Sequence, residues 1–391
     1  MAFLRPDLAE LGAYVQPAHA LPQIDPLDTN ENPLDLPDDL KVALSQRYRH
    51  EISANRYPDG SHQALKTAVL SYVAESAGLS PADLNADHIS LGSGSDELIR
   101  SLLIATCLGR RGAILVAVPT FSMYAVLAQT LDIPVVSVGR SEQRFEIDLA
   151  AAERAIATQS EPPIRVVFAV HPNSPTGNAL TAAERAWLEQ LPSDILVVVD
   201  EAYFEFSQQT TVAAALARPN WVVLRTFSKA FRLAAHRLGY AIAQPPLIAA
   251  LEKIRLPYNL PSFSQAAGLA ALAERNRLLA QIPSLLDSRE RLFTALAQQP
   301  ELRLWPSQSN FIYLRPSDRG LRSLGTDSSA VGQQRLFEQL LDRGTLVRHT
   351  GGGLRVSIGT ELENQRTMRH FQELLTDPTA HRPAASGASQ T

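Results

Sequence analysis

The stretch Val222–Ala243, VVLRTFSKAFRLAAHRLGYAIA, decides the fold and points to the chemistry. An apolar run at 222–224 is typical of the end of a buried strand, and a second run at 238–243 predicts another strand. Between the two runs the chain carries two hydroxyls, one amine and one guanidinium, on Thr226, Ser228, Lys229 and Arg237. Open α/β sheets bind ligands at the carboxyl ends of their strands. One amine beside several anion-binding groups suits a carbonyl compound that also carries a phosphate, although a serine–lysine pair alone is usually a solvated turn.

Composition limits the class of protein. A chain of 391 residues is too long for one small core and suits two lobes or one large α/β domain. Hydrophobic residues make up 45% and charged residues 19%, as in soluble globular proteins. A net charge of −4 without a long basic block gives little support to nucleic-acid binding. No apolar run approaches the roughly 20 residues of a membrane span, so we expect no membrane association.

The single cysteine, Cys107, excludes an internal disulfide and a cysteine-based metal cluster. Its apolar neighbours predict a buried helical position, and we expect no metal site. The N-terminus lacks a cationic start followed by an apolar core, so it does not resemble a secretory signal. We therefore expect a cytoplasmic protein.

Alternating strands and helices predict an α/β fold, with a large domain built on a mostly parallel seven-stranded sheet covered by helices. The expected strands are near-continuous runs of Val, Ile and Ala, as in strands buried on both faces, at 88–91, 113–118, 134–138, 165–170, 195–199, 221–224 and 238–243. The expected helices have apolar residues at helical spacing and lie at 62–77, 97–107, 124–130, 150–157 and 182–190.

The character of the chain changes near residue 265. A helix-rich stretch follows, and then short strands and helices are expected at 302–305, 310–314, 330–343, 345–348, 354–358 and 361–375. This mixture predicts a smaller α+β domain. We expect four regions: an N-terminal arm at 1–36, the large domain at 50–264, the small domain from 37–49 and 265–376, and a disordered tail rich in Pro, Ala and Ser at 377–391.

A glycine-rich segment, GSGSDE at 92–97, joins an expected strand to an expected helix. Its glycines let the backbone approach a ligand, and the free N–H groups at the helix start attract an anion. Ser95 and Asp96 can equally be ordinary N-caps. The segment lacks the glycine–lysine pattern of nucleotide-triphosphate loops, so it predicts a site for a single phosphate.

Three more segments follow expected strands. Phe121 can lie flat against a planar ring, or it can be an ordinary packing aromatic. The loop HPNSPTGN at 171–178 has two prolines and a glycine, which can hold a side-chain donor rigidly or form a plain turn. Asp200 ends the most apolar strand, where a buried carboxylate is costly unless a cation such as a protonated pyridine nitrogen meets it. Tyr203 can donate to a phenolic oxygen on the same ring.

Parallel strands place their carboxyl ends at one edge of the sheet, so all these segments are expected to converge. Together they describe a site for pyridoxal 5'-phosphate, in which the lysine amine forms a Schiff base and a carboxylate tunes the pyridinium.

On these residues the chain resembles the class I/II aminotransferases of the fold-type-I pyridoxal-phosphate enzymes. The resemblance runs from about Tyr14 to Leu375. Its most specific pieces are NENP at 30–33, NRYPDG at 55–60, GSGSDELI at 92–99, PNSPTGN at 172–178, DEAYFEF at 200–206, RTFSKAFRLAAHRLGY at 225–240 and GGGLRVSIGT at 351–360.

The resemblance implies a role for each matching residue. Lys229 would form the Schiff base and then shuttle the proton. Asp200 would pair with the pyridinium nitrogen, Tyr203 would hydrogen-bond the ring oxygen, and Phe121 would stack where the family usually has tyrosine or tryptophan. Tyr57 would reach the cofactor phosphate of a neighbouring subunit, which implies a homodimer with shared sites. The phosphate cup would comprise Gly94, Ser95, Asp96, Thr226, Ser228 and Arg237.

One position departs from the family pattern. The family loop normally reads Asn-Pro-Thr-Gly, and its asparagine touches the ring oxygen. Here Ser174 precedes Pro175, and Asn173 lies one place earlier. Either Ser174 substitutes with a shorter hydroxyl, or Asn173 turns in, and Tyr203 then becomes the main partner of that oxygen.

The resemblance also suggests a substrate. Arg355 matches the arginine that grips a carboxylate or phosphate, and Arg348, Tyr14 and Asn32 are expected to help bind a phosphorylated substrate. Two arginines near one anion favour a dianionic phosphate, although either can be a surface ion-pair residue. We expect amino transfer from histidinol phosphate to 2-oxoglutarate. The alternatives are transamination of aromatic amino acids, decarboxylation of a phospho-amino acid, and a non-catalytic binding module.

Overall fold

The computed structural model describes residues 3–6, 12 and 24–376, and within them the chain forms two compact units. The first unit holds 34–174 and 178–282, together with the described residues before position 20. The second unit holds 24–33, 175–177 and 283–376. This division differs from the expected domains, because 37–49 and 265–282 belong to the first unit, where helix α1 (Asp38–His50) packs against α10 (Ser262–Ala273).

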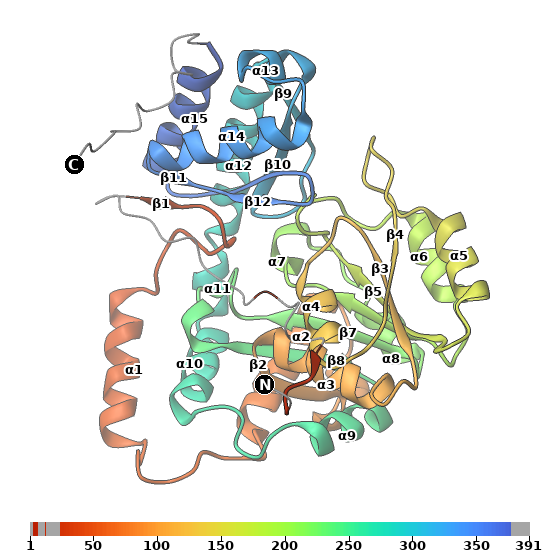
Figure 1. Ribbon diagram of the computed structural model, residues 1–391. Coiled ribbons are helices and arrows are strands. Elements are labelled where there is room, and N and C mark those ends of the chain that lie inside the picture. The colour runs from red at the N-terminus through yellow and green to blue at the C-terminus, as the bar shows by residue number, and fades with distance from the viewer. Residues whose placement is uncertain (1–2, 7–11, 13–23, 377–391) are drawn as a thin grey trace. The chain divides into compact units, whose positions relative to one another are not determined.

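A seven-stranded sheet runs through the first unit in the order β2-β8-β7-β6-β5-β3-β4 (Figure 1). All neighbouring strands are parallel except the two pairs that β8 makes, so the predicted mostly parallel sheet is confirmed. The strands are β2 (Ile89–Ser93), β3 (Ala113–Ala117), β4 (Val135–Val138), β5 (Ile164–Val170), β6 (Leu196–Asp200), β7 (Trp221–Thr226) and β8 (Leu238–Ala243), each ending within two residues of its predicted bounds.

Helices cover both faces of this sheet. One core contains side chains from α2 (Gln63–Ala77), α5 (Leu149–Thr158), α6 (Ala182–Gln190), α8 (Val212–Ala217) and α10. The other core contains side chains from α3 (Gly94–Thr106), α4 (Met123–Thr130) and α9 (Pro245–Ile254). In β6, Val197 and Val199 enter the first core while Leu196 and Val198 enter the second, which explains the uninterrupted apolar run. Two short helices, α7 (Phe204–Ser207) and α11 (Arg275–Leu279), complete the unit.

Local sequence sets several helix ends. Thr181 and Glu184 form a reciprocal capping box at the start of α6. Gly78 follows α2 in the left-handed conformation, with φ of 64°, and its N–H closes the last turn. Cys107 is buried as predicted, but it lies just beyond the last residue of α3.

The second unit is the predicted α+β mixture. Its antiparallel sheet has the order β12-β13-β10-β9, from β9 (Leu302–Trp305), β10 (Phe311–Pro316), β12 (Arg348–Thr350) and β13 (Gly353–Ser357). The strand expected at 345–348 is divided, because β11 (Thr345–Leu346) pairs instead with β1 (Asp25–Pro26). The helices are α12 (Ile282–Ala297), α13 (Asp318–Ser323), α14 (Ser329–Asp342) and α15 (Glu361–Thr376).

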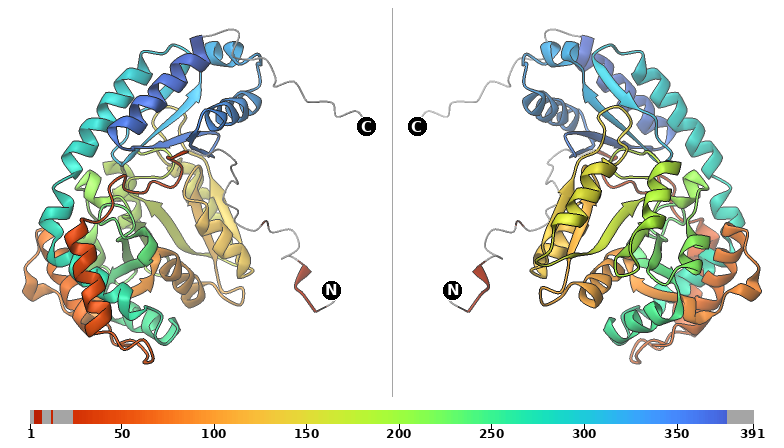
Figure 2. Two further views of the ribbon diagram at one scale, coloured as in Figure 1. Left: turned by 90° about the vertical axis from the view of Figure 1, so that its left-hand side faces the viewer. Right: turned by 90° about the vertical axis from the view of Figure 1, so that its right-hand side faces the viewer.

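Helices α12 and α15 run side by side in Figure 2, and Arg291 donates to Glu361 across them at 2.7 Å. In the part of the chain that the structure describes, no helix is both long and apolar enough to cross a membrane.

A buried ion pair joins β6 and β7 next to the carboxyl edge of the large sheet. Arg225 Nε donates to Glu201 Oε2 at 3.0 Å, and the two side chains are 1% and 0% exposed. Thr211 donates its N–H and hydroxyl to Glu201 Oε1, while Arg225 also donates to Ser76 Oγ at 2.9 Å. The guanidinium lies 3.6 Å from the ring centroid of Phe204. Burying two charges is costly, and these hydrogen bonds compensate for that cost.

We expect Glu201→Gln to lower the free energy of unfolding by about 3 kcal/mol, because it leaves a buried guanidinium without its counter-charge. The double variant E201Q/R225M removes both charges and is expected to regain at least half of that loss. Urea unfolding followed by circular dichroism measures both effects. A double variant less stable than E201Q would contradict this interpretation of the pair.

Candidate active site

The carboxyl edge of the large sheet gathers the predicted residues of the first unit. Gly94 follows β2, Phe121 follows β3, Asn173 follows β5, Asp200 ends β6, and Lys229 follows β7. Strand β2 points the same way as β7, because both are antiparallel to β8 between them. The expected convergence at one edge therefore occurs within this unit.

The predicted anion-binding residues surround the guanidinium of Arg237. Its Nη2 lies 3.2 Å from Asp96 Oδ2, and its Nη1 lies 3.4 Å from Ser228 Oγ. Thr226 Oγ1 donates to Ser228 Oγ at 3.0 Å, and the N–H of Gly94 donates to the carbonyl of Arg237 at 3.0 Å. These groups come from the ends of three neighbouring strands and form a cluster of hydroxyls and N–H groups beside one cation.

The start of α3 decides between the two interpretations of Ser95 and Asp96. The helix begins at Gly94, so both residues lie in its first turn, and the N-cap position belongs to Ser93. Ser95 and Asp96 are therefore not N-caps, and the first turn instead places Asp96 against Arg237.

Two features of the structure favour glycine at position 94. Its φ is +75°, and a Cβ atom there would lie 2.4 Å from Arg237 Nη2. The guanidinium therefore occupies the space that a side chain at position 94 would need.

Asp200 is a buried carboxylate held by hydrogen bonds. Its side chain accepts from the Tyr124 hydroxyl at 2.6 Å and from the N–H of Ala202 at 3.1 Å, and the residue is 3% exposed. Burial raises the pKa of Asp200 to about 6, although both hydrogen bonds oppose that rise. Within 24–376, no basic side chain forms an ion pair with Asp200. The described residues thus supply hydrogen-bond donors to this carboxylate, and none of them forms an ion pair with it.

Tyr124 is a site residue that sequence reasoning missed. It is fully buried, stacks on Phe168 with ring centroids 4.4 Å apart, and meets the ring of Phe121 edge-on at 5.5 Å. Its position three residues after Phe121, in the first turn of α4, was the available signal. Its partner Asp200 lies 76 residues further along the chain, so no local pattern reveals the contact.

The loop after β5 bears on the choice between Asn173 and Ser174. Asn173 Nδ2 donates to the carbonyl of Pro119 at 3.1 Å, and its Oδ1 accepts from Thr120 at 3.0 Å and from Arg140 at 3.3 Å. Both ends of this amide are therefore engaged with the segment that leads to Phe121. Asn173 therefore fixes this loop to the segment that leads to Phe121, and the choice between Asn173 and Ser174 as partner of the ring oxygen stays a prediction.

Arg140 is the second residue that the sequence did not reveal. It is buried and donates to the carbonyls of Ala117 and Phe145 at 2.8 and 2.9 Å, besides its contact with Asn173. It thereby ties the end of β3 to the loop after β5.

The remaining predicted residues of the first unit are placed as follows. Tyr203 is buried three residues after Asp200, and Lys229 is half-buried in the turn after β7. Tyr57 is 82% exposed and stacks on Tyr258 at 4.6 Å. Tyr14 lies outside the described residues.

The expected substrate residues that the structure describes lie in the second unit. Arg348 and Arg355 are direct partners across β12 and β13. Arg355 Nη2 donates to the carbonyl of Asp28 at 2.5 Å, and burial raises the pKa of the Asp28 carboxyl although both arginines oppose the rise. The turn that carries Asn32 is fixed to the same sheet, because Asn30 accepts from Ser357.

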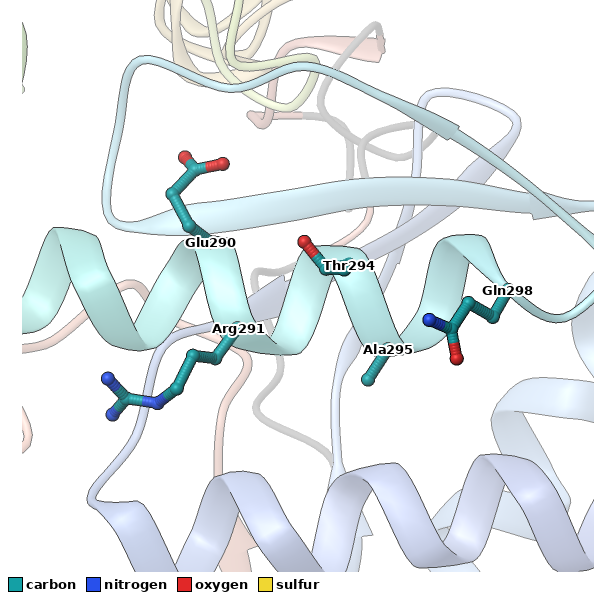
Figure 3. Close-up of a pocket in the computed structure, with 5 residues that line it drawn as sticks. All are labelled: Glu290, Arg291, Thr294, Ala295 and Gln298. Atoms are coloured by element: carbon teal, nitrogen blue, oxygen red, sulfur yellow. The ribbon is translucent and has the colours of Figure 1, made fainter.

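A pocket of about 400 Å³ lies elsewhere in the second unit (Figure 3). It is lined by Glu290, Arg291, Thr294, Ala295 and Gln298, all on or just after α12, and the labelled side chains project in different directions. It contains none of the predicted site residues, so it is not the candidate site.

The fold is that of an α/β enzyme, and its sheet edge carries a lysine, a buried carboxylate and a cluster of hydroxyls and N–H groups beside Arg237. The family model for aminotransferase class I and II matches residues 23–371, so the chain belongs to the aminotransferase class I and II family. The suspected resemblance and the predicted fold are both confirmed.

Three similar proteins illustrate the match. The chain is 54% identical over 373 residues to the histidinol-phosphate aminotransferase of Trichodesmium erythraeum, covering 95% of this chain and 98% of that protein. It is 56% identical to histidinol-phosphate aminotransferase 2 of a Nostoc species, covering 97% and 99%. The structure of histidinol-phosphate aminotransferase from Sinorhizobium meliloti in complex with pyridoxal-5'-phosphate has a TM-score of 0.79 at 24% identity, covering 96% of this chain and 98% of that one.

We expect Gly94→Ala to weaken binding of inorganic phosphate by at least about tenfold, because the new methyl group displaces the Arg237 guanidinium. Gly78→Ala is the matched control, since Gly78 also has a positive φ, of 64°, but no atom lies within 4 Å of the place that a methyl group would take there. Both variants should lose about 1 kcal/mol of stability from backbone strain. Phosphate titration monitored by NMR separates them, and equal phosphate affinities would contradict the proposed cup.

Proposed function

We propose that the protein is a pyridoxal-phosphate-dependent aminotransferase that transfers the amino group of histidinol phosphate to 2-oxoglutarate, giving imidazole acetol phosphate and glutamate, in histidine biosynthesis. The observation that carries this proposal is the grouping of Lys229, Asp200 and the Arg237 cup at one sheet edge of a family aminotransferase. The names of the Trichodesmium and Nostoc relatives support the choice of histidinol phosphate.

The residues present fit pyridoxal phosphate. Arg237, Ser228 and the first turn of α3 offer the donors that a phosphate requires. The buried Asp200 carboxylate suits a protonated pyridine nitrogen, because the described residues give it no basic partner of their own. The Sinorhizobium meliloti structure with bound pyridoxal phosphate supports the same assignment.

When bound, pyridoxal phosphate supplies an electron sink for the charge that develops at the substrate's α-carbon. Lys229 Nζ would hold the cofactor, and as a neutral amine it would carry the proton that leaves the substrate's α-carbon. The amine acts as a base only when it is neutral. Asp200 would keep the ring nitrogen protonated, and Phe121 would lie against the ring face. Tyr203, together with Ser174 or Asn173, would orient the ring oxygen.

Arg355 and Arg348 hold the anionic end of the substrate. Their cross-strand pairing places two guanidinium groups on one face of the sheet, which suits a dianion better than a single carboxylate. The same site has to accept an amino donor and an oxo acid in turn, so we expect ping-pong kinetics.

We also propose that the enzyme is a homodimer with shared sites. Tyr57 and Leu256 are largely exposed, at 82% and 71%, and Tyr57 stacks on the half-exposed Tyr258. A cluster of exposed large apolar side chains is typical of an interaction surface. Tyr57 would contact the cofactor phosphate of the neighbouring subunit. The cytoplasmic location expected from the sequence stays a prediction.

Lys229→Ala is expected to abolish turnover, because the covalent link and the proton carrier are lost together. Borohydride treatment followed by mass spectrometry should show a cofactor-sized mass increase on the wild-type chain and none on K229A. Retained turnover in K229A would show that the central assignment is wrong.

We expect kcat/KM for histidinol phosphate to exceed that for phenylalanine by at least about 100-fold, because an arginine pair binds a phosphate dianion that phenylalanine lacks. Arg355→Gln should reduce this ratio by about tenfold or more, mostly through KM. Arg319→Gln is the control, since Arg319 is an exposed ion-pair residue of the same unit.

A preference for phenylalanine would favour the aromatic aminotransferase instead. Release of carbon dioxide without any oxo acid would favour the decarboxylase. Both outcomes would contradict the proposed substrate while leaving the cofactor assignment intact.

A further inference from the structure

Tyr124 touches two residues of the cofactor site without belonging to any segment assigned to it. We propose that Tyr124 is a positioning residue whose hydroxyl orients the Asp200 carboxylate and keeps it charged for the cofactor's ring nitrogen. This inference rests on the proposed function and deepens it, by naming the group that makes the buried carboxylate usable.

The geometry fixes the hydroxyl. The distance from Tyr124 Oη to Asp200 Oδ2 is 2.6 Å, in the range of charge-assisted O–H···O⁻ bonds. The ring cannot turn away, because it is fully buried and stacks on Phe168 with an interplanar angle of 15°. Burial and the neighbouring Asp200 raise the pKa of the Tyr124 phenol well above its ordinary value, so the phenol keeps its proton and remains the donor.

The ionisable groups around Asp200 come from several elements. Asp96 on α3 and the adjacent Glu201 raise the pKa of Asp200, and burial raises it most. The Tyr124 hydroxyl from α4 and the N–H of Ala202 lower it. Lys229 lies in the turn after the neighbouring strand β7. Tyr124 is therefore the side chain whose hydrogen bond favours the charged carboxylate against burial and like charges.

Tyr124 also links two parts of the site. Its ring meets the edge of Phe121 at 5.5 Å, and its hydroxyl binds Asp200. Phe121 is the residue expected to lie against the ring face, and Asp200 is the residue expected at the ring nitrogen. One buried side chain thus sets the positions of both relative to each other.

Tyr124→Phe is the decisive variant, because it removes a single oxygen and retains the packing on Phe168. The matched control is Tyr72→Phe. The Tyr72 hydroxyl donates to Glu205 Oε1 at 3.0 Å, both residues are buried, and burial raises the pKa of Glu205 to about 7. The control therefore deletes the same hydroxyl oxygen next to a different buried carboxylate, that of Glu205. Glu205 lies in the same unit and has no proposed role in the site.

The experiment measures the dissociation constant of pyridoxal phosphate from pH 5.5 to 8.5 for cofactor-free wild type, Y124F and Y72F. Charged Asp200 is lost as pH falls through its pKa, and losing the hydrogen bond raises that pKa. We expect the pH below which cofactor binding weakens to rise by about one unit in Y124F, which corresponds to a tenfold change in the proton affinity of Asp200. Starting from a pKa of about 6, this shift weakens binding by about twofold at pH 7 and by nearly tenfold at pH 5.5. Y72F should keep the wild-type curve.

A Y124F curve that coincides with that of wild type would overturn the proposal. Equal shifts in Y124F and Y72F would overturn it as well, because they would report a general loss of packing. The wild-type arm tests the proposed function separately. If wild type binds the cofactor but does not turn over histidinol phosphate, only the substrate assignment fails. If wild type does not bind pyridoxal phosphate, the proposed function and the role of Tyr124 both fail.

Discussion

A carboxylate buried at the end of a parallel strand is the constraint on which the candidate site depends. Three acidic side chains lie close together at this point, and two of them have their own arginine. Asp96 pairs with Arg237, and Glu201 pairs with Arg225. Asp200 receives hydrogen bonds from Tyr124 and Ala202 but no basic partner among the described residues. Because burying an unpaired charge is costly, this arrangement suits a cation that arrives from outside the chain.

Strands β6 and β7 carry the buried ion pair on one face of the sheet and the candidate binding groups on the other face. Asp200 points to the core that contains Tyr124 and Phe168, while Glu201 and Arg225 meet among residues of the other core, next to Phe204. The alternation of side chains along β-strands makes this division possible. The ion pair thus fixes the ends of β6 and β7 from one side, and the binding groups occupy the other side.

Much of the fold was readable from the sequence, because strands buried on both faces appear as continuous apolar runs. The meeting of Asp96, Ser228 and Arg237 was predictable for a similar reason, since parallel strands bring their ends to one edge. Tyr124 and Arg140 were not predictable, because their partners Asp200 and Asn173 lie 76 and 33 residues away. We expected 37–49 in the small domain, but the structure groups this segment with the first unit because α1 packs against α10. Sequence periodicity shows that a helix forms, but it does not show which helix it packs against.

The second unit presents the opposite electrostatic problem. Arg348 and Arg355 face each other across neighbouring strands, and like charges at such positions repel. Burial raises the pKa of the nearby Asp28 carboxyl although both arginines oppose the rise, and Arg355 donates to the backbone carbonyl of Asp28. A dianion bound by both guanidinium groups would relieve this repulsion, whereas a monoanion would do so only in part. The proposed substrate phosphate is such a dianion, and the proposed cofactor nitrogen is likewise the cation that would complement Asp200.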